Sequence, residues 1–257
     1  MLGIRVIPTL LLRRGGLVKG AKFEKHQYVG DPVNAVRIFN DKFVDELIFL
    51  DINATNEGRS PDFELIKDIA SQAFMPLGYG GGLHTLKDVE RLFGLGIEKA
   101  ILNTAAIFDP NLIHEASTVA GSQSIVVSID VKRDFLGRYR VFTNSGKRDT
   151  NIDPIEYAKK VEECGAGEIL LCSIDREGTG IGYDLDLIRR VSSVVNIPIV
   201  ACGGAGQLPD FVKAIDNGAS SVAAGNMFTF YGKHKAVLLT YPEYSVLKLL
   251  FEEKKPC

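Results

Sequence analysis

Short apolar segments recur along the chain and alternate with stretches whose apolar residues follow a helical period. The apolar segments are rich in β-branched and aliphatic residues and lack the alternation of a half-solvated sheet, so they predict strands covered on both faces. Seven strands are predicted at residues 5–12, 47–52, 100–103, 124–131, 168–173, 197–202 and 221–224. An eighth, at 75–79, precedes a triple glycine.

The stretches between these strands predict amphipathic helices at residues 32–39, 62–73, 86–93, 111–119, 154–163, 184–194 and 208–217. Eight strand and helix units in 257 residues give about 32 residues a unit, which favours a closed parallel barrel over an open sheet. We therefore predict an α/β fold in which residues 1–257 form one (βα)8 TIM barrel. A polar insertion at about 132–151 could form a small hairpin on its rim.

The two halves of the chain resemble each other. LIFLDINAT around Asp51 resembles LLCSIDREGT around Asp175, GYGGGLHT resembles ACGGAGQL, and KAILNTAAIF resembles SVAAGNMFTF. The members of each pair lie about 120 residues apart, close to half the chain, as a duplicated half-barrel requires. The sequence thus predicts a barrel with a two-fold half-barrel repeat.

Composition excludes several classes of function. With 30 basic and 32 acidic side chains the net charge is -2, so no global field attracts nucleic acid or an anionic membrane. No segment approaches the roughly 18 apolar residues of a membrane span. The four cysteines contain no CxxC pair, which predicts neither a zinc site nor a disulfide framework. We expect a soluble cytoplasmic protein with reduced thiols, no metal and no cofactor.

Glycine-rich turns follow several predicted strands, where the reactive rim of a parallel barrel lies. Glycine lets backbone N–H groups approach a phosphate, and a neighbouring threonine or asparagine adds a donor. The repeat therefore predicts two facing phosphate cradles: Gly80, Gly81, Gly82, Asn103 and Thr104 in one half, and Gly203, Gly204, Gly225 and Asn226 in the other. Lys19, in a glycine-rich segment, could bend over a bound anion or lie in a solvated loop.

Aspartates end two of the predicted strands and are candidates for acid and base chemistry. Asp130 ends SIVVSID and Asp51 ends LIFLD; general catalysis and simple turn capping are both open to them. When VVSIDVKR is laid over VIPTLLLR, Leu11 falls opposite Asp130. A leucine cannot exchange a proton, so one half of a symmetric acid and base pair is missing.

Charged residues stand at the starts of four predicted strands, where an apolar barrel interior would not hold them singly. They are Arg5, Glu46, Lys99 and Glu168. Two of these residues are basic and two are acidic, so they could form a salt-bridge cluster around the N-terminal mouth of the barrel. A gate around a small axial passage is the functional alternative.

The sequence resembles the cyclase subunit of imidazole glycerol phosphate synthase over nearly the whole chain to about residue 230. The motifs RVIPxLL, GLVKG, GDPV, DELIFLDI, GGG, NTAA, GSQSIVVSID, FTNSGK, GAGEILL, SIDREGT, GGAG and FxF follow in family order. The resemblance implies a barrel whose N-terminal face docks a glutaminase. Ammonia released there would cross the barrel and react at the far rim with a bisphosphorylated ribulosyl aminoimidazole carboxamide.

The resemblance also implies roles for individual residues. Arg5, Glu46, Lys99 and Glu168 would be the ammonia gate, Glu98 would lie in the glutaminase interface, and Asp130 would be one of two catalytic aspartates. Leu11 stands where the other aspartate belongs, and loss of one such partner commonly costs about 10²- to 10⁴-fold in rate. The predicted substrate- and phosphate-binding set is Lys19, Asp51, Gly81, Gly82, Asn103, Thr104, Ser145, Glu177, Gly178, Gly203, Gly204, Gly225 and Asn226.

The leucine-rich first strand and the divergent tail at about 231–257, with YGKHKAVLLTYP, are similar to a branch of the family linked to bacterial surface-polysaccharide genes. The leading hypothesis is an ammonia-channelling subunit that works with a glutaminase and a separate sugar amidotransferase to form an amide or amidine on a surface sugar. The first rival is a working cyclase of histidine biosynthesis that uses Asp130, helped by Asp51. The second rival is a noncatalytic scaffold that binds a phosphorylated small molecule.

Overall fold

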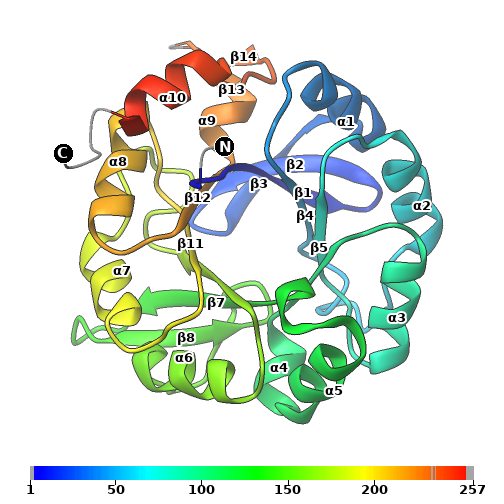
Figure 1. The fold of residues 1–257 in the computed structure, drawn as a ribbon, viewed down its shortest axis with the longest axis vertical. Helices are drawn as coiled ribbons and strands as arrows, with labels where there is room; N and C mark the ends of the chain where they lie inside the picture. The colour runs from blue at the N-terminus through cyan, green and yellow to red at the C-terminus, as the bar shows by residue number, and fades with distance from the viewer. Residues whose placement is uncertain (1–2, 233, 235, 253–257) are drawn as a thin grey trace.

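Eight parallel strands close into a ring surrounded by helices (Figure 1). This computed structural model describes residues 3–232, 234 and 236–252. Each strand pairs in parallel with the next, and the last pairs with the first through Ile7 and Ala223, which confirms the TIM barrel. In order around the ring the strands are β1 (Val6–Arg13), β4 (Leu47–Asp51), β5 (Leu77–Gly80), β6 (Lys99–Leu102), β7 (Ile125–Arg133), β10 (Glu168–Ser173), β11 (Ile199–Cys202) and β12 (Ser221–Ala224).

Helices cover the outer face of the ring, and all but α4, α9 and α10 correspond to the seven predicted helices within a few residues. They are α1 (Pro32–Asp41), α2 (Phe63–Gln72), α3 (Leu86–Gly94), α4 (Thr104–Phe108), α5 (Asn111–Ala120), α6 (Pro154–Glu163), α7 (Leu185–Ser192), α8 (Leu208–Asp216), α9 (Asn226–Thr229) and α10 (Tyr244–Glu252), with a 3₁₀ turn η1 (Ser122–Ser124). Among the residues that the structure describes, no helix has the length and apolar character that crossing a membrane requires.

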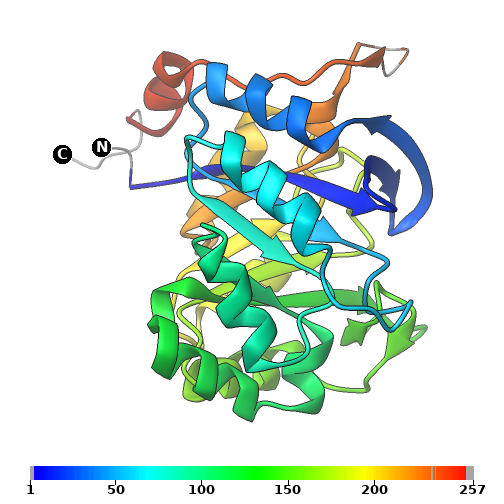
Figure 2. The same ribbon diagram turned by 90° about the vertical axis from the view of Figure 1, so that its right-hand side faces the viewer.

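Two hairpins rise at the carboxyl ends of the strands, on the same side of the barrel (Figure 2). In the first, β1 continues into β2 (Gly16–Ala21) and β3 (Glu24–Gly30). In the second, β7 pairs with β8 (Tyr139–Thr143), followed by β9 (Arg148–Asp149). The sequence predicted β1 of this hairpin but neither β2, GLVKGA, which contains two glycines, nor β3, EKHQYVG, which is polar and mostly exposed.

The two-fold repeat extends to helix caps. Asp62 and Asp184 cap α2 and α7 with nearly identical backbone angles, φ -78° and ψ 86° against φ -79° and ψ 86°. Each carboxylate accepts a bond from an otherwise unpaired N–H of the first turn, as helix N-termini require. Asp31 and Asp153 likewise precede the proline that begins α1 and α6.

The last helix, α10, lies in the tail that sequence reasoning left without an element. It packs beside α8 with Leu247 buried, after a short pair β13 (Phe230–Tyr231) and β14 (Ala236–Val237). Ahead of α10, the Tyr241 hydroxyl donates to the carbonyl of Val6, 2.8 Å away, at the start of β1. Residues 233, 235 and 253–257 of the predicted tail lie outside the described residues.

Two buried apolar clusters form the core. The larger lies between the ring and the helices. The smaller fills the inside of the barrel with aliphatic side chains and two thiols. Its members are Ile7, Ile48, Ile101, Val126, Leu170, Cys172, Val200, Cys202 and Ala223.

Candidate active site at the carboxyl rim

A pocket opens at the carboxyl ends of the barrel strands, directly above the apolar interior. The space between its walls measures about 1020 Å³ when the open mouth is included. The pocket wall contains these predicted residues: Leu11, Lys19, Asp51, Gly81, Gly82, Asn103, Thr104, Asp130, Ser145, Glu177 and Gly225. The other predicted residues, Gly178, Gly203, Gly204 and Asn226, are not part of that wall.

Asp130 lies buried at the base of the pocket, on β7. Ser128 Oγ and Asn103 Nδ2 donate to its carboxylate over 3.1 and 3.2 Å. Burial disfavours the charged form of Asp130 and raises its pKa to about 7. The nearby Glu177 adds to this shift, and the two hydrogen bonds oppose it. A carboxyl group with such a pKa can both release and take up a proton near neutral pH.

Leu11 lines the same pocket from β1. It stands in register with Leu50 of β4 and Val18 of β2, so its surroundings on those two sides are aliphatic. The two positions that the repeat made equivalent therefore share one cavity, and only Asp130 of the pair carries an ionisable group.

Asp51 is engaged by its own loop. Arg59 Nη2 contacts both carboxylate oxygens, at 2.8 and 3.1 Å, and the N–H groups of Asn53 and Ala54 donate to Oδ1. Sequence reasoning missed Arg59, which precedes Ser60 and Pro61 in a loop without a motif. These contacts favour the turn-capping alternative for Asp51 over proton transfer, because both carboxylate oxygens of Asp51 already accept hydrogen bonds.

The first predicted cradle borders the pocket. Gly81 and Gly82 adopt φ of 112° and 73°, and a Cβ on Gly81 would lie 2.3 Å from the carbonyl oxygen of Asp51. Only glycine fits there. Thr104 accepts a bond from Asn144 N–H of the second hairpin, and Ser145 Oγ donates to Ile52 O at 2.6 Å.

The second predicted cradle is covered by Lys19. This side chain is 1 % exposed, and its Nζ donates to Thr9 O at 2.6 Å. A Cβ on Gly225 would lie 2.0 Å from that Nζ, so the ammonium rests against this glycine. Burial lowers the pKa of Lys19, and Glu177 opposes the shift. Lys19 is buried on the strand β2, so the solvated-loop alternative is wrong.

Asn226 and Gly178 hold backbone segments together beside the second cradle. Asn226 Nδ2 donates to the carbonyls of Gly20 and Gly178, each at 3.1 Å. Gly203 and Gly204 adopt φ of 89° and 114°, and the Gly204 carbonyl accepts from Gly182 N–H at 2.8 Å. The two halves thus share a backbone pattern but present different surfaces to the pocket.

The entrance ring, defined as Arg5, Glu46, Lys99 and Glu168, closes the opposite end of the barrel. Arg5 bonds both glutamates. Lys99 Nζ lies 3.0 Å from Glu46 and 2.6 Å from Glu168. Opposite charges alternate around the mouth, so each ion has two partners. Burial opposes the charge on Arg5, but the glutamates outweigh it and raise its pKa.

Two polar details surround the entrance ring. Glu46 Oε1 is buried without a hydrogen-bond partner among the described residues, leaving a free acceptor beside the mouth. Glu98, the predicted interface residue, is exposed next to Lys99, and its carboxylate accepts from Leu77 N–H at 2.7 Å.

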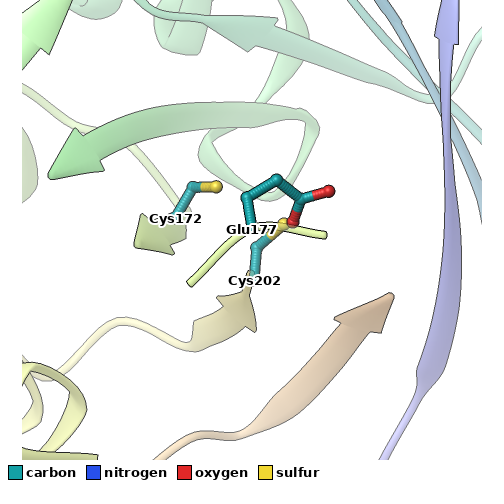
Figure 3. Close-up of side chains that lie close together, drawn as sticks. All are labelled: Cys172, Glu177 and Cys202. Carbon is teal, nitrogen blue, oxygen red and sulfur yellow. The ribbon is translucent and has the colours of Figure 1, made fainter. Parts of the chain in front are cut away.

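Cys172 and Cys202 were treated as unrelated in the sequence, yet they are direct partners on the neighbouring strands β10 and β11. Their sulfur atoms and a carboxylate oxygen of Glu177 lie within 4.8 Å of one another (Figure 3). The hydrogen bond between the thiols, together with burial, raises the pKa of Cys172. Spacing alone could not show this proximity, because it depends on strand order.

A pocket above the strand ends of a parallel barrel is where enzymes of this architecture bind their ligands, so fold and pocket define a TIM barrel with an enzyme-type site. The model of the family described as "Histidine biosynthesis protein" matches residues 5–235, and the chain belongs to that family, among its HisF-like members.

Three relatives cover nearly the full length of both chains. "Putative imidazole glycerol phosphate synthase subunit hisF2" of Pseudomonas aeruginosa is 49% identical over 244 residues, 95% of this chain and 97% of the relative. "Putative imidazole glycerol phosphate synthase subunit HisF" of Leptospira interrogans is 47% identical over 253 residues, 98% and 100%. "Imidazole glycerol phosphate synthase subunit HisF" of Endomicrobium trichonymphae is 45% identical over 230 residues, 90% and 88%. They confirm the resemblance read from the motifs.

Proposed function

We propose that this chain is the ammonia-channelling subunit of a glutamine amidotransferase and acts in the cytoplasm with a glutaminase partner. The observation that carries the proposal is the pairing of two features at opposite ends of the barrel. The entrance ring is complete at one end, whereas the pocket at the other end holds Asp130 without a second ionisable partner at Leu11. The acceptor we favour is a surface-polysaccharide sugar that receives an amide or amidine with the help of a separate sugar amidotransferase.

The barrel interior supports passage of a small neutral molecule. Apart from the thiols of Cys172 and Cys202, its lining between the entrance ring and the pocket is aliphatic, and Leu50, Ile101 and Leu170 border both the interior and the pocket. Neutral ammonia enters such surroundings more readily than ammonium, because burying an unpaired charge is costly. The free acceptor on Glu46 offers a hydrogen bond to a donor crossing the ring.

The face around the entrance ring supports a protein partner. Phe43 and Phe74 follow α1 and α2 in loops on that side and are 87 % and 91 % exposed. A concave surface nearby is lined by Phe93, Ile97 and Glu98, among others. Exposed aromatic side chains beside a groove are typical of a protein interface.

The rim pocket supports a phosphorylated ligand at one end. Gly82, Thr104 and Ser145 lie in the wall of the pocket. Their N–H and hydroxyl groups donate to Thr55, Asn103 and Ile52, and binding of an anion would exchange these bonds for bonds to the ligand. Lys19 also lines the pocket. Its Nζ lies against Gly225, so this amine covers the second glycine cradle and would face a ligand there.

Glutamine hydrolysis tests the partnership. We expect a class I glutaminase subunit from the same organism to bind this chain and to hydrolyse glutamine faster in its presence. Replacing both Phe43 and Phe74 by glutamate should weaken the complex at least about 10-fold, because it buries charge in an apolar contact. Binding is measured by calorimetry and hydrolysis by glutamate release.

The matched control is Phe135→Glu, an equally exposed phenylalanine (93 %) on the hairpin at the opposite rim. It should leave binding unchanged. No complex with any glutaminase subunit of that organism, or equal weakening by the control, would refute the proposed partner face. Binding of a phosphorylated ligand without ammonia transfer in the assembled system would instead support the scaffold function.

A cyclase of histidine biosynthesis is the second candidate, favoured by the pKa of Asp130 near 7. For this candidate, wild-type chain should rescue a histidine auxotroph that lacks its cyclase subunit. For the proposed function it should not, and Leu11→Asp should gain cyclisation by about 10²-fold or more, since it restores the missing partner. Leu11→Asn, of similar size without an ionisable group, is the control, and cyclisation is followed by product formation with ammonium as nitrogen source.

A further inference from the structure

Cys172, Cys202 and Glu177 form a cluster with the chemistry of a metal site. Two thiol sulfurs and a carboxylate oxygen lie within 4.8 Å of one another, and all three residues line the rim pocket (Figure 3). Both cysteines are free and buried. Three protein ligands beside an open cavity are the arrangement of catalytic zinc sites, in which the fourth position takes water or substrate.

Strand register fixes the two sulfurs. Cys172 and Cys202 are Cα partners across β10 and β11, and both side chains belong to the cluster inside the barrel. Glu177 comes from the loop that follows β10, whose backbone is held by the bond from Lys22 N–H to Glu177 O at 2.9 Å. The three candidate ligands therefore lie on barrel strands and on an anchored turn, so little conformational entropy is lost when they bind a metal.

A divalent cation would compensate the negative charge of thiolate and carboxylate ligands in this cluster. The buried Lys19 lies near the same three side chains and would add to that compensation. Lys19 interacts electrostatically with each of the three ligands. A buried site is favourable only when its charges are compensated, and a divalent cation beside Lys19 would supply compensation.

We infer that Cys172, Cys202 and Glu177 bind one thiophilic divalent cation of the Zn²⁺ class, whose open coordination position faces the rim pocket. The site lies at the boundary between the apolar interior and the pocket. The inference does not depend on the glutaminase partnership, because it concerns binding of the metal to this chain alone.

Cobalt substitution tests the site. The full chain carrying Cys164→Ser and Cys257→Ser keeps Cys172 and Cys202 as its only thiols, since the sequence has four cysteines. Reduced, metal-free protein should bind one Co²⁺, show thiolate-to-cobalt charge-transfer absorption and lose it when Zn²⁺ is added. Zn²⁺ should also raise the unfolding temperature, as a ligand of the native state does.

In that background, Cys172→Ser or Cys202→Ser should weaken Co²⁺ binding by more than about 100-fold. Mutating a residue that only hydrogen-bonds to a metal ligand costs roughly 10–100-fold, and loss of a ligand should cost more. Glu177→Gln should keep the thiolate absorption but bind more weakly. Absence of charge-transfer absorption, its survival in both serine variants, or a Cys172–Cys202 disulfide that forms equally with and without Zn²⁺ would overturn the inference. Circular dichroism confirms that each variant is folded.

Discussion

Replacing Lys99 by methionine should lower the free energy of unfolding by about 2–3 kcal/mol, because it leaves two buried glutamates sharing Arg5. The methionine keeps most of the side-chain volume, so the loss reports charge and not a cavity. For a chain of this size the unfolding temperature should fall by about 5–10 °C. Thermal unfolding followed by circular dichroism at pH 8 measures it.

The deficit of Lys99→Met reports the loss of one of the two cations that pair with the buried Glu46 and Glu168. The control is Lys159→Met on α6, whose pair with Glu156 is solvent-exposed at 3.0 Å and contributes less than about 1 kcal/mol. Equal losses in the two variants would show that the entrance ring behaves as an ordinary set of surface ions.

Replacing Asp130 by asparagine should stabilise the chain at pH 8. The native-state pKa of Asp130 is about 7, above its ordinary value, so the native state binds the proton more tightly than the unfolded chain does. This contribution to stability is present at low pH and is lost as pH rises through 7. With about 1.4 kcal/mol per pKa unit, the charged carboxylate costs the native state up to about 4 kcal/mol at pH 8.

We expect Asp130→Asn to gain about 1–3 kcal/mol at pH 8 and much less at pH 5, measured by urea unfolding at each pH. Asp134→Asn is a control of opposite sign. Two backbone N–H groups and Arg138 donate to that carboxylate and, against some desolvation, lower the pKa of Asp134, so its removal should destabilise the chain at pH 8. A gain from Asp130→Asn that is equal at both pH values would exclude relief of buried charge as its cause.

The barrel was predictable because its strands are continuous apolar runs separated by amphipathic helices, and the triple glycine Gly80 to Gly82 marked the end of the eighth strand. The strand predicted at 75–79 is shifted toward the glycines, at Leu77–Gly80, because short strands carry little information about their ends. The helix α10 escaped prediction because it follows a segment unrelated to the repeat and has one buried side chain, Leu247.

The site was predictable where residue type and strand position coincided. Asp130 and Leu11 fall in one pocket, and the entrance ring assembles from four strand starts, because a barrel brings equivalent strand ends together. Arg59 and the pairing of Cys172 with Cys202 could not be read in advance. They depend on a loop path and on which strands are neighbours, and neither leaves a local pattern.

The bond from Tyr241 to the carbonyl of Val6 means that the barrel is fastened twice where its ends meet. Pairing of β12 with β1 supplies one closure. The tyrosine supplies another, immediately next to Arg5, where Val6 N–H also donates to Asp45 at 3.0 Å. Divergence of the tail can therefore alter how the first strand is held without touching any barrel strand, so the geometry at the entrance ring can be adjusted from outside the repeated architecture.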